Sequence, residues 1–336
     1  MRRTVSLLAR AGAAALCAAL CTAGASGPAE AKAKITTFDP QGSGGTFASA
    51  INATGAITGY YLDSARNEHG FLRASDGTMT SFDVSGGSET VANSISGLGA
   101  IAGYFQAQSM QEGFVRATDG TITTFYDTGA TIPVGINDKG QVTGSWQDTS
   151  GHWRGFVRSA GGKFKNFDPS GAVSSYPFGI NDKGVIAGEY IDSNNIYHGF
   201  VRAKDGTITA FDPQGSVYTS PFGISDKGVV VGSYADSNDV FHGFLRAPDG
   251  TITSFDVSGA SGTFADSIDS KGAIAGYYTV FGGGYHGFER SAAGTIKAFD
   301  PRNSTYTRPE GIAGPAEAAG YYSDTIGVYH GFLRSK

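Results

Sequence analysis

The chain has 336 residues, of which 16% are charged, 12% are aromatic and 51 are glycine. Aromatic residues favour strands and glycine favours turns, so this composition indicates an all-β protein. It excludes a coiled coil, a helical bundle and a disordered tail. The formal net charge of −5 has the wrong sign for binding phosphates, so we expect no nucleic-acid partner.

Residues 1–31 differ in composition from the rest of the chain. Three arginines accompany an apolar run over residues 11–21, which is too short to span a bilayer. Small residues follow, and the whole pattern predicts a secretory signal peptide cleaved after Ala25 or Ala31. A membrane anchor is the alternative interpretation of the same segment.

Both cysteines of the chain, Cys17 and Cys21, fall within this leader. We therefore expect a mature protein with no disulfide, no thiol nucleophile and no cysteine metal site. Export through a signal peptide predicts a secreted or periplasmic protein that is not embedded in a membrane. We also expect a monomer.

Three short patterns recur seven times, at intervals of about 44 residues. They are a Gly-Phe pair, a Phe-Asp pair (with Tyr126 inserted in one copy) and a single isoleucine. The Gly-Phe pairs begin at Gly70, Gly113, Gly155, Gly199, Gly243, Gly287 and Gly331. The seven copies fill residues 34–336, so the repeat overrides the two-domain expectation that length alone gives.

Each copy is predicted to contain four short strands. In the fifth copy they cover residues 220–225, 229–235, 241–247 and 251–256, with Asp-Lys-Gly and Pro-Asp-Gly turns between the paired strands. Four-stranded antiparallel units of 40–50 residues are typical of β-propeller blades. We therefore expect residues 32–336 to form one seven-bladed β-propeller domain.

The two ends of the repeat array are complementary. The array begins with a lone fourth strand, residues 35–39, and stops after a third strand, residues 330–334. The N-terminal strand can therefore complete the last blade and remove a free sheet edge. An open solenoid is the alternative, but it would need capping units that neither end resembles.

The unit that runs from Ile180 to Gly188, followed by His198-Gly199-Phe200, resembles the bacterial extracellular HAF repeat. That family is named for a His-Ala-Phe motif, and glycine replaces the alanine throughout this chain. The resemblance covers essentially the whole mature chain. It implies secretion and a repeat fold of the β-propeller type, and it implies no activity and no catalytic residues.

Charged residues that recur in every copy are expected to serve packing rather than chemistry. The six histidines lie on third strands of different blades, away from the axis, so they cannot converge on a metal ion. We expect neither a metal nor a cofactor. The recurrent Arg of Gly-Phe-x-Arg and the Asp of Phe-Asp are expected to form hydrogen bonds between strands or blades.

Variable loops are predicted to share one rim of the propeller, and aromatic residues gather there. Trp153 enters a third strand, and Tyr218 and Tyr306 are placed on loops. Aromatic rings among Asn, Ser and Asp suit the C–H faces of sugar rings, which makes these three residues candidate ligand-binding groups. Blade packing is the alternative for the aromatic residues that recur.

The innermost strand carries a variable column between two columns of small residues. The variable column reads Ser49, Asn93, Val134, Phe178, Phe222, Asp266 and Glu310. Asp266 and Glu310 occupy equivalent positions in adjacent copies, so their side chains are predicted to be neighbours. Two close carboxylates can share a proton, bind a cation or act as an acid and a base. Arg308 could neutralise one of them, and a solvated or ion-paired channel lining is the alternative.

Two classes of function fit this sequence. The favoured one is a non-catalytic binding module for a glycan or another extracellular polymer, with no catalytic residue and with Asp266, Glu310 and Arg308 in its site. The alternative is a polysaccharide-active lyase or hydrolase that uses Asp266 and Glu310 at the central face. The sequence does not identify the ligand.

Overall fold

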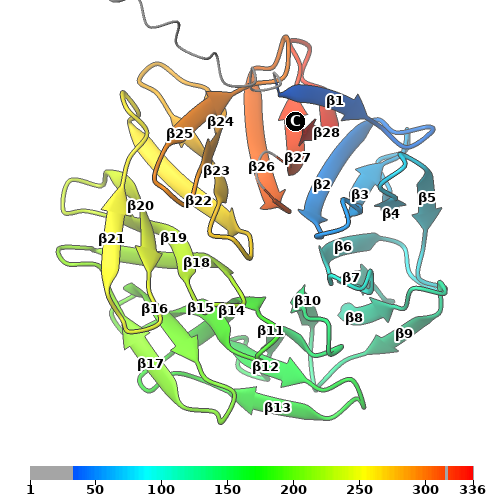
Figure 1. The fold of residues 1–336 in the computed structure, drawn as a ribbon. Helices are drawn as coiled ribbons and strands as arrows, with labels where there is room; N and C mark the ends of the chain where they lie inside the picture. Colours follow the sequence, from blue (N-terminus) through cyan, green and yellow to red (C-terminus); the bar gives the residue numbers. More distant parts are fainter. Residues whose placement is uncertain (1–32, 315–316, 336) are drawn as a thin grey trace, which may run out of the picture. The chain divides into compact units, whose positions relative to one another are not determined.

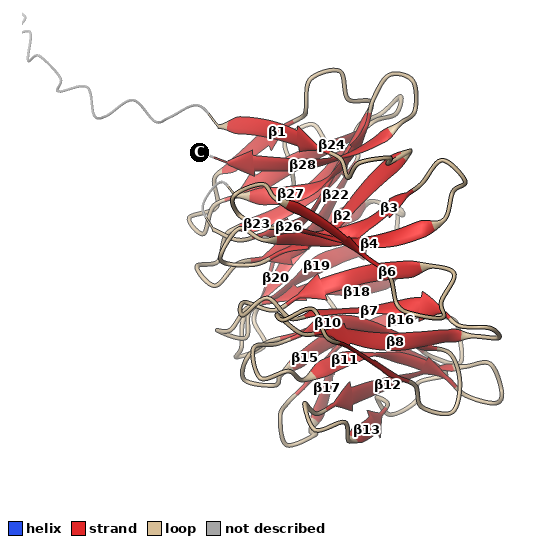
Figure 2. Cartoon of the chain, turned by 90° about the vertical axis from the view of Figure 1, so that its right-hand side faces the viewer, coloured by secondary structure: helices blue, strands red, loops and turns tan. Residues whose placement is uncertain are grey.

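The computed structural model describes residues 33–314 and 317–335, and its strands are antiparallel in every four-stranded sheet. The described residues form 28 strands and no helix (Figures 1 and 2). The predicted signal peptide, residues 1–31, and both cysteines lie outside the described residues. The expectation of an all-β chain is confirmed.

Five sheets have four strands each, and the strands follow one another in chain order. The first contains β2 (Gly45–Ile51), β3 (Ile57–Leu62), β4 (Glu68–Arg73) and β5 (Met79–Phe82). The second contains β6 (Thr90–Ile95), β7 (Ile101–Gln106), β8 (Gln111–Arg116) and β9 (Ile122–Phe125). The third contains β10 (Thr131–Ile136), β11 (Val142–Gln147), β12 (Trp153–Arg158) and β13 (Phe164–Phe167). The fourth contains β14 (Ser174–Ile180), β15 (Ile186–Ile191), β16 (Tyr197–Arg202) and β17 (Ile208–Phe211). The fifth contains β18 (Tyr218–Ile224), β19 (Val230–Ala235), β20 (Phe241–Arg246) and β21 (Ile252–Phe255).

A sixth sheet has eight strands. One run of it contains β22 (Gly262–Ile268), β23 (Ile274–Thr279), β24 (Tyr285–Arg290) and β25 (Ile296–Phe299). The other contains β26 (Tyr306–Ile312), β27 (Ala318–Ser323), β28 (Tyr329–Ser335) and β1 (Lys34–Phe38). A single parallel residue pair, Tyr285 with Tyr306, joins the two runs.

The sheets are arranged around a common centre, with the first strand of each run innermost (Figure 1). Turns predicted from Asp-Lys-Gly and Asp-Gly connect the paired strands. Gly228 and Gly250 adopt positive φ angles of 84° and 95°, which glycine tolerates without steric cost. Their N–H groups donate to the carbonyls of Ser225 and Ala247, three residues earlier. The four strands of the fifth copy therefore match the predicted ranges to within two residues.

Phenylalanines of the two recurrent pairs form the core between sheets. The Phe of every Gly-Phe pair is completely buried, as Phe244 illustrates. The preceding Gly243 leaves room for the ring of Phe255, which ends the fourth strand, since a Cβ there would lie 2.7 Å from that ring. The Phe-Asp phenylalanine of one copy then packs edge-on against the Gly-Phe phenylalanine of the next, as Phe211 does with Phe244 at 5.9 Å.

The recurrent arginine binds the neighbouring copy in a way that the sequence did not predict. In all seven copies its guanidinium lies over the Phe-Asp ring of the preceding copy, 4.4 to 5.2 Å from the centroid. The pairs are Arg73 with Phe38, Arg116 with Phe82, Arg158 with Phe125, Arg202 with Phe167, Arg246 with Phe211, Arg290 with Phe255 and Arg334 with Phe299. The contact that all seven copies share is therefore a cation–π contact, because a planar guanidinium stacks well on an aromatic face. In the last copy Arg334 also forms an ion pair with Glu289 of the copy before it.

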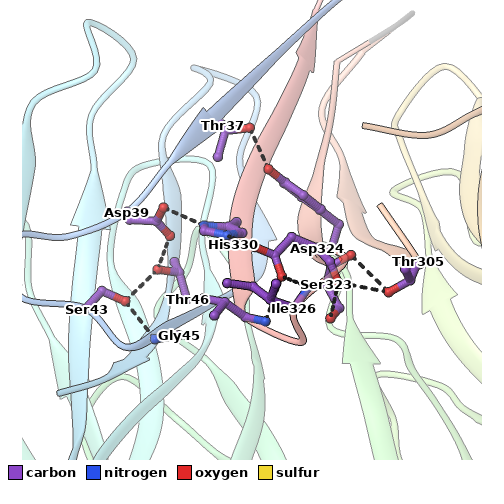
Figure 3. Close-up of polar contacts among 12 residues, drawn as sticks. Thr37, Asp39, Ser43, Gly45, Thr46, Thr305, Ser323, Asp324, Ile326 and His330 are labelled. Atoms are coloured by element: carbon purple, nitrogen blue, oxygen red, sulfur yellow. Dashed lines mark hydrogen bonds and ion pairs between the residues drawn. The ribbon is translucent and has the colours of Figure 1, made fainter. Parts of the chain in front are cut away.

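The chain ends meet as the sequence predicted. Strand β1 pairs antiparallel with β28 over its whole length. Asp39 then joins the two ends, accepting hydrogen bonds from Thr46 on β2 at 2.6 Å and pairing with His330 on β28 at 2.8 Å (Figure 3). The space beside Gly311 on β26 is also filled by Ile51 on β2. An open solenoid has no such contacts between its first and last units, so this alternative is wrong.

Candidate functional site

Each first strand contains a β-bulge, and the side chain at the bulge points toward the centre of the ring of sheets. In all seven first strands the pairing with the second strand shifts register across one residue, which is left outside the ladder as a β-bulge. The residues at the bulges are Ser49, Asn93, Val134, Phe178, Phe222, Asp266 and Glu310. This is the variable column that the sequence singled out.

All seven bulge residues line one pocket of about 320 Å³, which we call the axial pocket. Phe47, Tyr60, Arg308 and Tyr321 complete its lining. The small residues on either side of the column are required by close packing between first strands. A Cβ on Gly311, for example, would lie 2.9 Å from the Ile51 side chain.

Three charged residues meet on one side of the axial pocket. The Nε atom of Arg308 lies 2.8 Å from a carboxylate oxygen of Glu310 and 3.7 Å from Oδ2 of Asp266. The side chain of Asp266 is only 5% exposed, and neither of its carboxylate oxygens has a hydrogen-bond partner. The side chains of Glu310 and Arg308 are more accessible, at 22% and 30%. The structure therefore brings together the three charged residues that the sequence proposed.

Burial sets the charge state of this group. Desolvation raises the pKa of Asp266 well above its usual value, and Glu310 adds to this effect while Arg308 opposes it. Desolvation likewise raises the pKa of Glu310 to about 7, against the attraction of Arg308. Burial alone would lower the pKa of Arg308, but the two carboxylates outweigh it and raise that pKa, so the guanidinium stays charged. The group thus holds one permanent cation and two carboxyls that resist ionisation.

Aromatic rings form much of the remaining wall. Phe47 stacks on Tyr60 at 4.9 Å, and Phe178 lies 5.4 Å from Phe222 across the neighbouring repeats. Tyr277 lies outside the lining but supports it, since the guanidinium of Arg308 sits 5.2 Å from its ring centroid. The axial pocket therefore has a charged side and a side of apolar and aromatic groups.

The three aromatic candidates from the sequence do not line this pocket. Tyr218 and Tyr306 are the first residues of β18 and β26, so their placement on loops was wrong. The strands extend to them because both continue the ladder, Tyr218 opposite Ala235 and Tyr306 opposite Ser323. Trp153 begins β12, as expected for a residue entering a third strand.

Tyr218 and Tyr306 belong instead to a chain of ring contacts. Successive centroids along it are 4.6 to 6.0 Å apart. In order, the rings are Tyr197, Tyr218, Phe241, Phe264, Tyr277, Tyr285, Tyr306, Tyr321, Phe47 and Tyr60. The last three line the axial pocket, so this aromatic chain links the pocket to residues of three further sheet runs.

Recurrent histidines contact aspartates within their own sheets. Nδ1 of His242 lies 3.0 Å from Asp256, and its Nε2 lies 3.7 Å from Asp236. In the third copy Arg154 stands at the same strand position and pairs with the equivalent aspartates, Asp148 and Asp168. Among the described residues no cluster of three or more His, Cys, Asp or Glu could hold a metal ion.

Two features of the site region were missed in the sequence. Phe47, Tyr60 and Tyr321 line the axial pocket, although strand patterns alone do not distinguish them from packing residues. Glu189, outside the pocket lining, is another buried carboxylate, 6% exposed, with an Oε2 atom that has no hydrogen-bond partner. Desolvation raises its pKa to about 7, against a hydrogen bond from Ser220. Glu189 could have been recognised in the sequence, because the equivalent position on the other second strands is always Tyr or Ser.

Comparison with solved structures identifies the class of fold. Virginiamycin B lyase from Staphylococcus aureus matches with a TM-score of 0.62 and 13% identity, covering 91% of this chain and 100% of that one. A streptogramin B lyase structure matches with a TM-score of 0.61 and 13% identity, covering 90% and 98%. The β-propeller domain of the Trilobed protease from Pyrococcus furiosus matches with a TM-score of 0.61 and 10% identity, covering 86% and 95%. The chain therefore has a β-propeller fold, and identities this low show the fold alone.

No protein-family model and no curated protein matches the sequence. The fold comparison supports a propeller-type repeat without supporting the particular HAF repeat. In the described parts of the chain, no helix has the length and apolarity needed to cross a membrane.

Proposed function

We propose that this protein is a binding module that takes a glycan, or another polyhydroxylated extracellular polymer, at its axial pocket. The observation that supports this most directly is the composition of the pocket, where aromatic rings face a group of three charged side chains. Sugar rings offer C–H faces to aromatic side chains and hydroxyl groups to charged hydrogen-bonding partners. Phe178 and Phe222 would contact the C–H faces, and Glu310 and Arg308 would bind the hydroxyl groups.

We also propose the organisation of the chain around this site. Residues 1–31 would be an export signal, and residues 32–336 a single propeller of seven blades in the manner of the HAF repeat. The two runs of the eight-stranded sheet would then count as two blades, because one residue pair alone joins them. N-terminal sequencing of the exported protein tests the cleavage after Ala25 or Ala31, and light scattering tests the expected monomer.

A panel of immobilised polysaccharides tests the binding function. The double variant Asp266→Asn with Glu310→Gln keeps the shape of both side chains and removes their charge. We expect wild type to be retained by at least one polysaccharide and the double variant, equally well folded, to lose at least 90% of that binding, on the order of a tenfold weakening. Equal retention of both proteins would mean that the pair only lines the pocket.

A polysaccharide lyase or hydrolase is the second candidate. It is favoured by one observation, that two carboxyl groups with raised pKa values share the pocket and one titrates near neutral pH. Propellers of similar fold include lyases, by their names. Incubation with the same panel distinguishes the candidates, since an enzyme would generate reducing ends or unsaturated products that Asp266→Asn or Glu310→Gln abolishes. Binding without formation of products would support the binding module and exclude the lyase or hydrolase for these polysaccharides.

A further inference from the structure

The charges in the axial pocket do not balance when both carboxyls are ionised. Arg308 supplies one positive charge, and Asp266 and Glu310 supply two negative ones. No other charged residue lines the pocket. Asp266 is nine-tenths buried and both its oxygens lack hydrogen-bond partners. The one cation near it, Arg308 at 3.7 Å, lies closer to Glu310 and cannot neutralise both carboxylates. An uncompensated buried carboxylate is costly, and a proton or an added cation relieves that cost.

The walls of the pocket favour an organic cation over a metal ion. Mg²⁺ and Ca²⁺ take six or more oxygen ligands, and zinc takes about four His, Cys or carboxylate ligands. This lining offers two carboxyls and the aromatic faces of Phe47, Phe178, Phe222 and Tyr321. Ammonium groups bind such faces by cation–π attraction. The pocket volume of about 320 Å³ accommodates an ammonium group together with part of the body that carries it.

We propose that the axial pocket recognises a ligand that carries a primary ammonium group. Glu310 is the direct partner of that group, and Asp266 is the buried carboxylate that makes the site prefer a cation over a neutral or acidic ligand. The inference rests on the proposed function and narrows it, because it assigns a glycan with free amino groups rather than a neutral or acidic one. Glu310 is accessible to such a ligand, while Asp266 acts from within the wall across a low-dielectric region.

Competition between the ligand and a proton is a consequence of this arrangement. The carboxyl pair resists ionisation near neutral pH, so an arriving ammonium group displaces a proton from it. Other titratable groups that act on the pair are few. They are Arg308 on the same strand as Glu310, and the phenols of Tyr60, Tyr277 and Tyr321 from the neighbouring strands, whose raised pKa values keep them neutral in this range. Proton release therefore reports on the carboxyls.

Calorimetry with matched sugars tests the proposal. The probes are a β-1,4-linked glucosamine hexamer, its fully N-acetylated counterpart, benzylamine and benzyl alcohol. We expect the amino hexamer to bind at least tenfold more tightly than the acetylated one at pH 6, where its amino groups are already charged, with net proton release measured in buffers of different ionisation enthalpy. Asp266→Asn should reduce this preference to less than twofold. Asp249→Asn, which removes one exposed carboxylate from the turn between β20 and β21, should leave the preference intact.

Each result separates the inference from the function on which it rests. Equal affinity for both hexamers, unaffected by Asp266→Asn, overturns the ammonium site and leaves glycan binding in place. Binding of benzylamine but not benzyl alcohol, lost in Asp266→Asn and with no hexamer bound, supports the ammonium site and overturns the glycan function. Absence of binding by any of these probes at millimolar concentration overturns the proposal. A variant that fails to fold is replaced by Glu310→Gln, for which the same loss of preference is expected.

Discussion

Asp266 is a residue whose burial opposes stability at neutral pH. Its pKa is higher in the folded protein than in the unfolded chain. The folded state therefore favours the neutral carboxyl, and the free energy of unfolding falls as the pH rises above about 4, the pKa of Asp in an unfolded chain. In Asp266→Asn the residue cannot ionise, so this fall in unfolding free energy is absent, while Arg308 keeps its 2.8 Å contact with Glu310. We expect the variant to be more stable than wild type at pH 8, by on the order of 1 kcal/mol.

Thermal unfolding between pH 4 and pH 8 measures this effect. The difference in Tm between variant and wild type should widen as the pH rises. Asp249→Asn serves as the control for the loss of one negative charge, and its Tm difference should not show this trend. A variant that melts at or below the wild-type temperature at pH 8 would contradict the description of Asp266 as an unsatisfied carboxylate.

Arg246 illustrates the contact that joins each copy to the one before it. Its guanidinium lies 4.9 Å from the ring centroid of Phe211, and the residue is only 8% exposed. A lysine keeps the charge and loses the planar stacking surface, so we expect Arg246→Lys to cost about 1 kcal/mol of unfolding free energy. Urea denaturation measures it, with the exposed Arg302→Lys as the matched control. An unchanged midpoint for both variants would mean that the stacked geometry contributes nothing.

Residue-scale features of the site were predictable to different degrees. Asp266 and Glu310 were recognisable because each breaks a column that is neutral in the other copies. The role of Arg246 was not, because it depends on how far one sheet is offset from the next. Tyr321 was not recognisable either, since the twist of a strand decides whether its side chain reaches the axis.

Between strands, the contact of His330 with Asp39 is a pH-sensitive link. Burial would lower the pKa of His330, but the carboxylates of Asp39 and Asp324 outweigh this effect and raise it above 6.5. The stabilisation is therefore complete below about pH 6.5 and is lost as the pH rises through the raised value. An arginine keeps its charge throughout, and Arg154 already forms the equivalent pairs in the third copy.

We therefore expect His330→Arg to make the docking of β1 independent of pH between 6 and 9. Amide hydrogen exchange of β1, corrected for intrinsic rates, should show progressive loss of protection in wild type and none in the variant. His242→Arg changes the same link in another sheet and should leave β1 as in wild type. A wild-type β1 that is equally protected at pH 6 and pH 9 would show that His330 does not hold it.

Strands and turns were the part of the fold that the sequence predicted best. The Asp-Lys-Gly and Asp-Gly turns leave few alternatives for the residues that flank them, so the fifth copy was placed to within two residues. The starts of the first strands were less certain, because the turn before each of them ends some residues upstream, as the turn at Gly215 does before β18. Tyr218 and Tyr306 were therefore assigned to loops and proved to begin β18 and β26.

The closure of the whole ring depends on five residues from the other end of the chain. Strand β1 covers the edge of β28, and without it that edge would be unpaired and Arg73 would lose the ring of Phe38. We expect deletion of residues 34–39 to lower the Tm by at least 5 °C, because it exposes a strand edge and removes contacts of the first and last runs.

A circular permutant provides the control for this deletion. It begins at β2 and carries residues 34–39 after residue 335, joined through a Pro-Asp-Gly turn like that of residues 248–250. Every strand is then present and β1 follows β28 directly, so we expect a Tm within a few degrees of wild type. A deletion variant as stable as the permutant would mean that the ring does not need β1.

The β-bulges of the first strands have a consequence for how such a protein can change. Because the bulge residue stands outside the ladder, its replacement breaks no pairing between strands, and Val134, Phe178 and Glu310 all occupy the same backbone geometry. The residues that determine the fold and the residues that determine which ligand binds are therefore at different positions in each repeat. Gene duplication can multiply the scaffold, and later substitutions at seven positions can diversify the pocket one repeat at a time. A library randomised at those seven codons would sample new ligands on an unaltered frame.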